Sequence, residues 1–158
     1  MADTFNMDQM RDLMTPPFPA KTKQAARTIA GTLTDVMTVS FSDKIMVVIT
    51  QNGRLAQWLH VPLENANPAA EDGYHTIQES ADDSILLPMP GLTATSILGG
   101  RAPEHETIGQ LYATQIGSAI VTKNPNEKRL LVVGLGLDKL EADRDIFFSV
   151  VDLVLECL

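Results

Sequence analysis

The chain has 158 residues, of which 44% are hydrophobic and 20% charged, so it is long enough and apolar enough to bury the core of one globular domain. Its formal net charge of −8 argues against a nucleic-acid backbone or an anionic membrane surface as the natural partner. Cys157 is the only cysteine in the sequence, which excludes an intrachain disulfide and a CxxC metal or redox pair.

The N-terminal stretch, residues 1–22, is predicted to be a flexible tail. The run TPPFP at residues 15–19 breaks any helix, and MADTFNMDQMRDLM before it lacks the basic and apolar regions of a signal peptide. No apolar run approaches the roughly 20 residues that span a bilayer, so we expect a cytoplasmic location or also a nuclear one. A short partner-binding helix over residues 1–14 is the alternative, because Phe5 and three methionines recur at loosely helical spacing.

Residues 23–31 are expected to form a first strand, and residues 35–63 a three-stranded antiparallel meander. Asn52-Gly53 between two apolar runs is a strong hairpin signal, since a type I′ turn needs positive φ at both central residues. Ser42-Asp43 is a weaker candidate for a two-residue turn. Such turns place Val39 opposite Met46 and Met37 opposite Val48, and they place Met46 opposite Leu59.

Side chains alternate between the two faces of this meander. One face is predicted to lie beneath helices and carries Met37, Val39, Phe41, Met46, Val48, Leu55 and Leu59. The other face carries Thr38, Ser40, Ile45, Val47, Ile49, Ala56, Trp58 and His60. A slip of one residue would exchange the faces. From the second face we take Thr38, Ile45, Val47, Ile49 and Trp58 as the candidate partner interface.

The second half of the chain is predicted to contain two helices. Residues 64–91 form an acidic, mobile insertion, and residues 92–100 form a strand. A helix over residues 103–116 ends at Gly117 and is followed by a hairpin of two strands, residues 118–122 and 129–137.

The last helix is amphipathic and is expected to start near Asp138, which has capping-box spacing to Glu141. Its predicted apolar stripe is Leu140, Phe147, Val150, Val151, Val154 and Leu158. The fold class is therefore α+β, a single domain over residues 23–158 with a largely antiparallel β-sheet and two helices on one face. Because two helices cover only one face, the Trp58 face remains for a partner.

No catalytic, cofactor-binding or metal-ligating constellation is predicted. His60, His75 and His105 lack metal-ligand spacing, and Ser118 lacks the GxSxG pattern of a hydrolase. The GLG at residues 134–136 has neither the third glycine nor the downstream acid of a dinucleotide site, so close packing or a bulge explains it better.

Several segments carry a family resemblance. VSFSDKIMVVITQNGRL lies within residues 35–65, and TSILGG, TIGQLYATQIGSAIVTK, RLLVVGLGL and a terminal amphipathic helix follow in order. This pattern resembles the proteasome assembly chaperone 3 family. The N-terminal extension and the acidic insertion at about residues 65–90 depart from shorter family members.

The resemblance implies a non-catalytic chaperone of 20S proteasome assembly without a cofactor. It implies a heterodimer with proteasome assembly chaperone 4 that holds α-subunits, notably the fifth, while the α-ring forms. It leaves open whether the chain forms a homodimer when that partner is absent. Two other classes stay open: a generic α+β dimerising adaptor unrelated to the proteasome, and an enzyme with an unfamiliar site.

Overall fold

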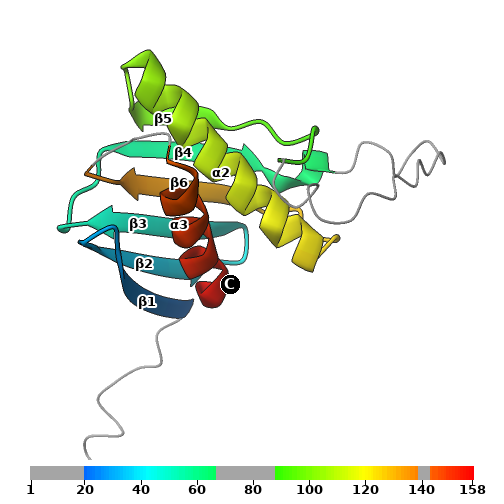
Figure 1. Cartoon of the computed structure of the whole chain (residues 1–158). Helices are drawn as coiled ribbons and strands as arrows, with labels where there is room; N and C mark the ends of the chain where they lie inside the picture. The colour runs from blue at the N-terminus through cyan, green and yellow to red at the C-terminus, as the bar shows by residue number, and fades with distance from the viewer. Residues whose placement is uncertain (1–19, 67–87, 139–142) are drawn as a thin grey trace, which may run out of the picture.

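A single six-stranded sheet organises the chain (Figure 1). The computed structural model describes residues 20–66, 88–138 and 143–158. The strand order is β1-β2-β3-β6-β4-β5. The elements are β1 (Lys21–Ile29), β2 (Thr32–Ser40), β3 (Lys44–Gln51), β4 (Gln57–Pro62), the 3₁₀ turn η1 (Leu63–Ala66), β5 (Thr95–Gly99), α2 (Pro103–Lys123), β6 (Leu130–Gly136) and α3 (Arg144–Cys157).

The predicted hairpin of β2 and β3 is confirmed. Ser42-Asp43 is the turn, closed by a 2.9 Å hydrogen bond in which Phe41 N donates to the Lys44 carbonyl. Val39 pairs with Met46, and Met37 with Val48, as two-residue turn geometry requires.

The rest of the predicted meander is wrong, because β6 lies between β3 and β4. Asn52 and Gly53 do have positive φ, 53° and 68°. The chain leaves this turn away from β3, however, and the Ala56 amide donates to the Leu135 carbonyl of β6 at 2.9 Å. β6 runs parallel to β3 and antiparallel to β4, so Leu59 lies opposite Val133 and not opposite Met46.

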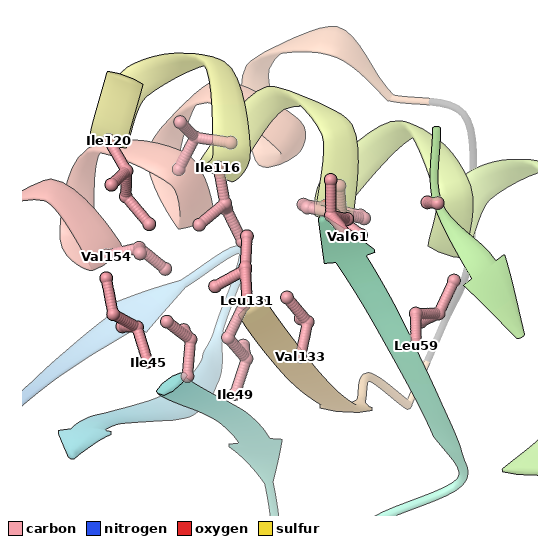
Figure 2. Packing of buried hydrophobic residues seen from close by; sticks show 14 of the residues in the cluster. Ile45, Ile49, Leu59, Val61, Ile116, Ile120, Leu131, Val133 and Val154 are labelled. Carbon is pink, nitrogen blue, oxygen red and sulfur yellow. The ribbon is translucent and has the colours of Figure 1, made fainter. Parts of the chain in front are cut away.

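Both helices cover the same face of the sheet, with α3 over β1 and β2 and α2 over β4 (Figure 1). Ile45 and Ile49 of β3 and Leu131 of β6 point toward Ile120 of α2 and Val154 of α3 (Figure 2). All five are buried, because only this side of the sheet can exclude water beneath the helices. The predicted class, an α+β domain with a largely antiparallel sheet and two helices on one face, is confirmed.

The helix α2 is longer than the sequence predicts. It continues through Gly117 to Lys123, so the predicted strand 118–122 is wrong. A Cβ on Gly117 would lie 3.2 Å from the Leu92 side chain and 3.3 Å from that of Leu63. The glycine thus lets the helix approach its neighbours closely, and it does not end the helix. Tertiary packing overrides the local stop signal.

The last helix begins later than predicted, at Arg144. Its N-cap is Asp143, whose carboxylate accepts hydrogen bonds from the amides of Asp145 (2.9 Å) and Ile146 (3.2 Å). The Asp138 carboxylate instead accepts a hydrogen bond from the side-chain Nδ2 of Asn52, while the Asp138 backbone N–H donates to Gln51 Oε1 at 2.9 Å. The predicted apolar stripe is confirmed at Val150, Val151 and Val154. Leu140 and Glu141 lie outside the described residues.

Two predicted segments fall largely outside the described residues. The sequence predicts a tail that ends at residue 22, whereas β1 starts at Lys21, and residues 1–19 are not described. Of the expected insertion over residues 64–91, residues 64–66 belong to η1 and residues 67–87 are not described.

Candidate functional site: the open face of the sheet

Among the residues that the structure describes, the sheet has one face that no helix covers, and on β2 and β3 it is not the face predicted. Val47 and Ile49 are fully buried and Ile45 is 6% exposed, so these three side chains belong to the core beneath the helices. Thr38 is buried as well, and its hydroxyl donates to the Cys157 carbonyl of α3 at 2.7 Å. The assignment of these four residues to an exposed face is therefore wrong. The two faces of β2 and β3 are exchanged.

Trp58 alone of the five candidate interface residues lies on the uncovered side. Its neighbour Leu59 is fully buried on the helix side, and Trp58 alternates away from it. Val133 of β6 pairs with Leu59 of β4 on one side and with Val47 of β3 on the other. Leu59 and Val47 therefore lie on the same, core-facing side of the sheet. Trp58 therefore shares its face with the residues that alternate with Val47.

We call this uncovered surface the open face. The apolar side chains that strand register places on it include Leu33, Met37, Met46, Val48, Trp58, Leu98 and Val132. Leu98 is 65% exposed and Leu33 53%, while the other five are half-buried. A hollow of about 590 Å³ lies at one side of the open face, where Met37 and Val48 meet Gln24, Asp35 and Thr50. The open face thus combines an apolar centre with a polar margin, which is typical of protein interfaces.

A glycine seats the tryptophan of the open face. A Cβ on Gly134 would lie 3.0 Å from the Trp58 ring, so the ring lies directly over this glycine of β6. A Cβ on Gly136 would lie 1.6 Å from the Arg54 carbonyl oxygen. The GLG of residues 134–136 therefore serves close packing, as its place in a strand predicts. Gly134 is therefore the feature of the sequence that indicates on which face of the sheet Trp58 lies.

The residues considered for catalysis have structural surroundings. Ser118 Oγ donates to the Thr114 carbonyl and accepts from the Met89 amide, both at 2.8 Å. Burial raises the pKa of Tyr112 to about 12, and its ring packs against Phe147. Within the described parts of the chain, no three His, Cys, Asp or Glu side chains could together hold a metal ion. His75 falls outside those parts.

An ion pair fixes the loop between α2 and β6 against the β2–β3 hairpin. Arg129 donates to both oxygens of Glu127, at 2.8 and 2.7 Å, and to Ser40 Oγ and the Phe41 carbonyl, each at 2.8 Å. The Arg129 guanidinium holds the pKa of Glu127 below its ordinary value, although burial opposes this. The carboxylate side chain is only 8% exposed, so its charge depends on this partner.

Replacing Glu127 by Gln should lower the free energy of unfolding by about 1 kcal/mol at neutral pH, because charged hydrogen bonds to Arg129 are lost. A carboxylate with a lowered pKa stabilises the fold above its unfolded pKa, and this contribution disappears as the pH falls through the folded pKa. Wild type and variant should therefore converge in acid. Urea unfolding from pH 3 to pH 7 measures both curves. A constant difference across that range would contradict the role of the ionised carboxylate.

The comparisons with known proteins agree with this architecture. Residues 47–157, more than half of the chain, match the model of a family of proteasome assembly chaperones. The chain belongs to the proteasome assembly chaperone 3 family, as the resemblance predicted. The members of this family are non-catalytic and have a role in 20S proteasome assembly, so the chain is not an enzyme.

A solved structure has the same fold. It is described as the crystal structure of a novel chaperone complex for yeast 20S proteasome assembly. The match has a TM-score of 0.53 and 13% sequence identity, and it covers 86% of this chain and 97% of that chain. At this identity the likeness concerns the fold alone. No curated protein matches the chain. Among the helices that the structure describes, none is long and apolar enough to cross a membrane.

Proposed function

We propose that the chain acts as a heterodimer with a small protein similar to proteasome assembly chaperone 4. The pair holds proteasome α-subunits, notably the fifth, while the α-ring forms, in the cytoplasm or also in the nucleus. One observation carries the proposal: among the described residues, the helices cover one face of the sheet only, and apolar side chains such as Met37, Met46, Val48 and Trp58 lie on the open face. Exposed apolar surface of this kind marks interaction sites.

The open face has the chemistry of a partner interface. Trp58 is a rigid, half-buried aromatic anchor of the type that dominates binding energy. Met37 and Met46 beside it are flexible side chains that adapt to an opposing surface. Covering these residues with a second sheet would build a core of the type found in two-layer sandwiches.

The edges of the sheet favour contact through the face over strand addition. The β1 edge carries Lys21, Lys23 and Arg27, and charged side chains along an edge strand oppose pairing with another chain. The β5 edge is only five residues long, and its register with β4 shifts between Trp58 and Leu59. Such irregularity also discourages an added strand.

The same face would allow a homodimer when the partner is absent. Two copies related by a twofold axis would bring their Trp58 and Met46 patches together, since an isologous contact uses one surface twice. Light scattering of the purified chain alone, over a range of concentrations, measures this equilibrium.

The interface is tested by Val48→Asp, which places a charge on the open face without entering the core. The dissociation constant of the complex with the proteasome assembly chaperone 4-like partner should rise roughly a hundredfold, because the carboxylate would lose its water upon binding. The matched control is Leu155→Asp, since Leu155 is 40% exposed on α3 on the other side of the sheet. Isothermal titration measures both affinities. Equal affinities for the two variants would refute the open face as the interface.

The cellular role is tested by depletion and rescue. Cells that lack the chain should accumulate free α-subunits and incomplete rings, seen by native gel electrophoresis with antibodies to α-subunits. Wild type and Leu155→Asp should restore mature 20S particles, whereas folded Val48→Asp should not. Normal ring formation after depletion would favour the alternative, a dimerising adaptor unrelated to the proteasome.

A further inference from the structure

A cavity of about 400 Å³ opens at one end of the sheet, on the side of the helices and away from the open face. It lies between the C-terminal ends of α2 and α3, the start of β1 and the end of β2. Its charged lining residues are Lys21, Lys23, Lys123, Arg129 and Glu127. Four of the twelve basic residues of a chain with net charge −8 thus meet at one cavity.

Two of the lysines, Lys21 and Lys123, supply charge that the described residues do not neutralise. Arg129 is paired with Glu127, which leaves the guanidinium occupied. Lys23 Nζ donates to the main-chain oxygen of Leu158 at 3.1 Å, so its ammonium group already has a partner within the fold. Lys21 and Lys123 are exposed and form no ion pair with any residue that the structure describes. The cavity therefore presents two ammonium groups, those of Lys21 and Lys123, that form no ion pair within the described residues.

Helix dipoles explain only part of this arrangement. Lys123 lies in the last turn of α2, where a cation is favoured by the partial negative charge of the helix end. Lys21 and Lys23 lie on an edge strand, where no such preference acts. Both alternate to the helix side, toward the cavity, together with Thr38 of β2.

The interior of the cavity favours a peptide over a nucleotide. Ile45 and Ile120 contribute buried apolar surface to it, and Thr38 and Ser40 contribute hydroxyl groups. No aromatic side chain is among the lining residues, so none of them could stack a base. The one guanidinium fork, which would bind phosphate in bidentate fashion, is held by Glu127. A volume of about 400 Å³ lies within the range of small ligand sites.

We infer that this cavity binds an acidic peptide segment of a protein partner. A carboxylate of the segment lies between Lys21 and Lys123, and an adjacent apolar side chain packs on Ile45 and Ile120. The site is separate from the open face, so it remains available while a partner covers Trp58. The inference does not depend on the proposed heterodimer.

The experiment measures fluorescence anisotropy of a fluorescein-labelled peptide, Gly-Glu-Leu-Glu-Leu-Glu-Gly, with the full-length protein. A second peptide carries Gln at each Glu position. The test variant is Lys21→Glu with Lys123→Glu. The matched control is Arg54→Glu with Arg101→Glu, which changes the net charge equally at two exposed residues outside the cavity lining. Circular dichroism melting checks that both variants are folded.

Wild type and control should bind the acidic peptide alike, and the test variant should bind it roughly tenfold more weakly. The affinity of the wild type for the Gln peptide should be no higher than the affinity of the test variant for the acidic peptide. Absence of binding by wild type, or equal weakening in both variants, overturns the inference. Displacement of the peptide by an equal concentration of inorganic phosphate also overturns it, because it would indicate an unspecific anion site. The variant Lys21→Glu with Lys123→Glu should bind the open-face partner with the same affinity as the wild type.

Discussion

Val47→Asp should unfold the domain, whereas Val48→Asp should leave it folded. Val47 is fully buried and pairs in register with Val133 of β6, beneath the helices. An ionised carboxylate there has no cationic partner and would cost roughly 4 kcal/mol or more. That is comparable to the whole stability of a small domain, about 5–15 kcal/mol. Val48 points to the open face, where a carboxylate keeps its water.

The pair of variants tests which face of β3 the helices cover. Thermal unfolding followed by circular dichroism at 222 nm gives the melting temperature of each. We expect no cooperative transition for Val47→Asp and a near wild-type transition for Val48→Asp. The reverse order would mean that the register of β3 beneath the helices is shifted by one residue, with the faces exchanged.

Gly136→Ala should be the most damaging glycine replacement in β6. The added Cβ would lie 1.6 Å from the Arg54 carbonyl oxygen and 2.4 Å from its carbon, and both are backbone atoms. The chain entering β4 would have to move, which should lower the free energy of unfolding by about 3 kcal/mol. Chemical denaturation with guanidinium measures the loss.

Gly134→Ala is the matched control for that variant. Its Cβ would meet the Trp58 ring at 3.0 Å, and a side chain can shift where a backbone cannot. We expect a loss of about 1 kcal/mol, abolished when Trp58 is also replaced by Ala. Equal losses at the two glycines, or no coupling between Gly134 and Trp58, would contradict the packing described.

The sequence predicts those parts of the fold that depend on neighbouring residues. The turn at Ser42-Asp43 and the pairing of Met37 with Val48 follow from local turn chemistry, and both are confirmed. The amphipathic pattern of α3 likewise identifies Val150, Val151 and Val154 as buried. The fold class follows from the number of such elements.

The insertion of β6 between β3 and β4 could not be predicted in this way. It joins residues about 85 positions apart, such as Val47 and Val133, and no turn residue encodes that contact. Asn52-Gly53 forms its predicted turn, yet the strand after it pairs with β6. A strong hairpin signal predicts that the chain reverses its direction, but it does not predict which strand the following segment pairs with.

The choice of buried face was wrong because both faces of β3 are apolar. One face holds β-branched Ile45, Val47 and Ile49, and the other holds Met46 and Val48. The β-branched set pairs with Leu131, Val133 and Leu135 of β6. The other face of β6 includes Gly134, and a face that packs in the core would not require a glycine at this position. Of the five candidate interface residues only Trp58 lies on the open face, although His60, which the sequence also assigns to the uncovered side, lies there too.

The most direct measurement is affinity purification of the tagged chain from its native cell, followed by mass spectrometry of the bound proteins. Wild type and Val48→Asp are purified in parallel from isotope-labelled cultures. We predict free α-subunits and one other small protein with wild type, without mature protease, and loss of that small protein with Val48→Asp. Recovery of the small protein in equal amounts with both, or absence of proteasome subunits from wild type, would contradict the proposed function of the open face.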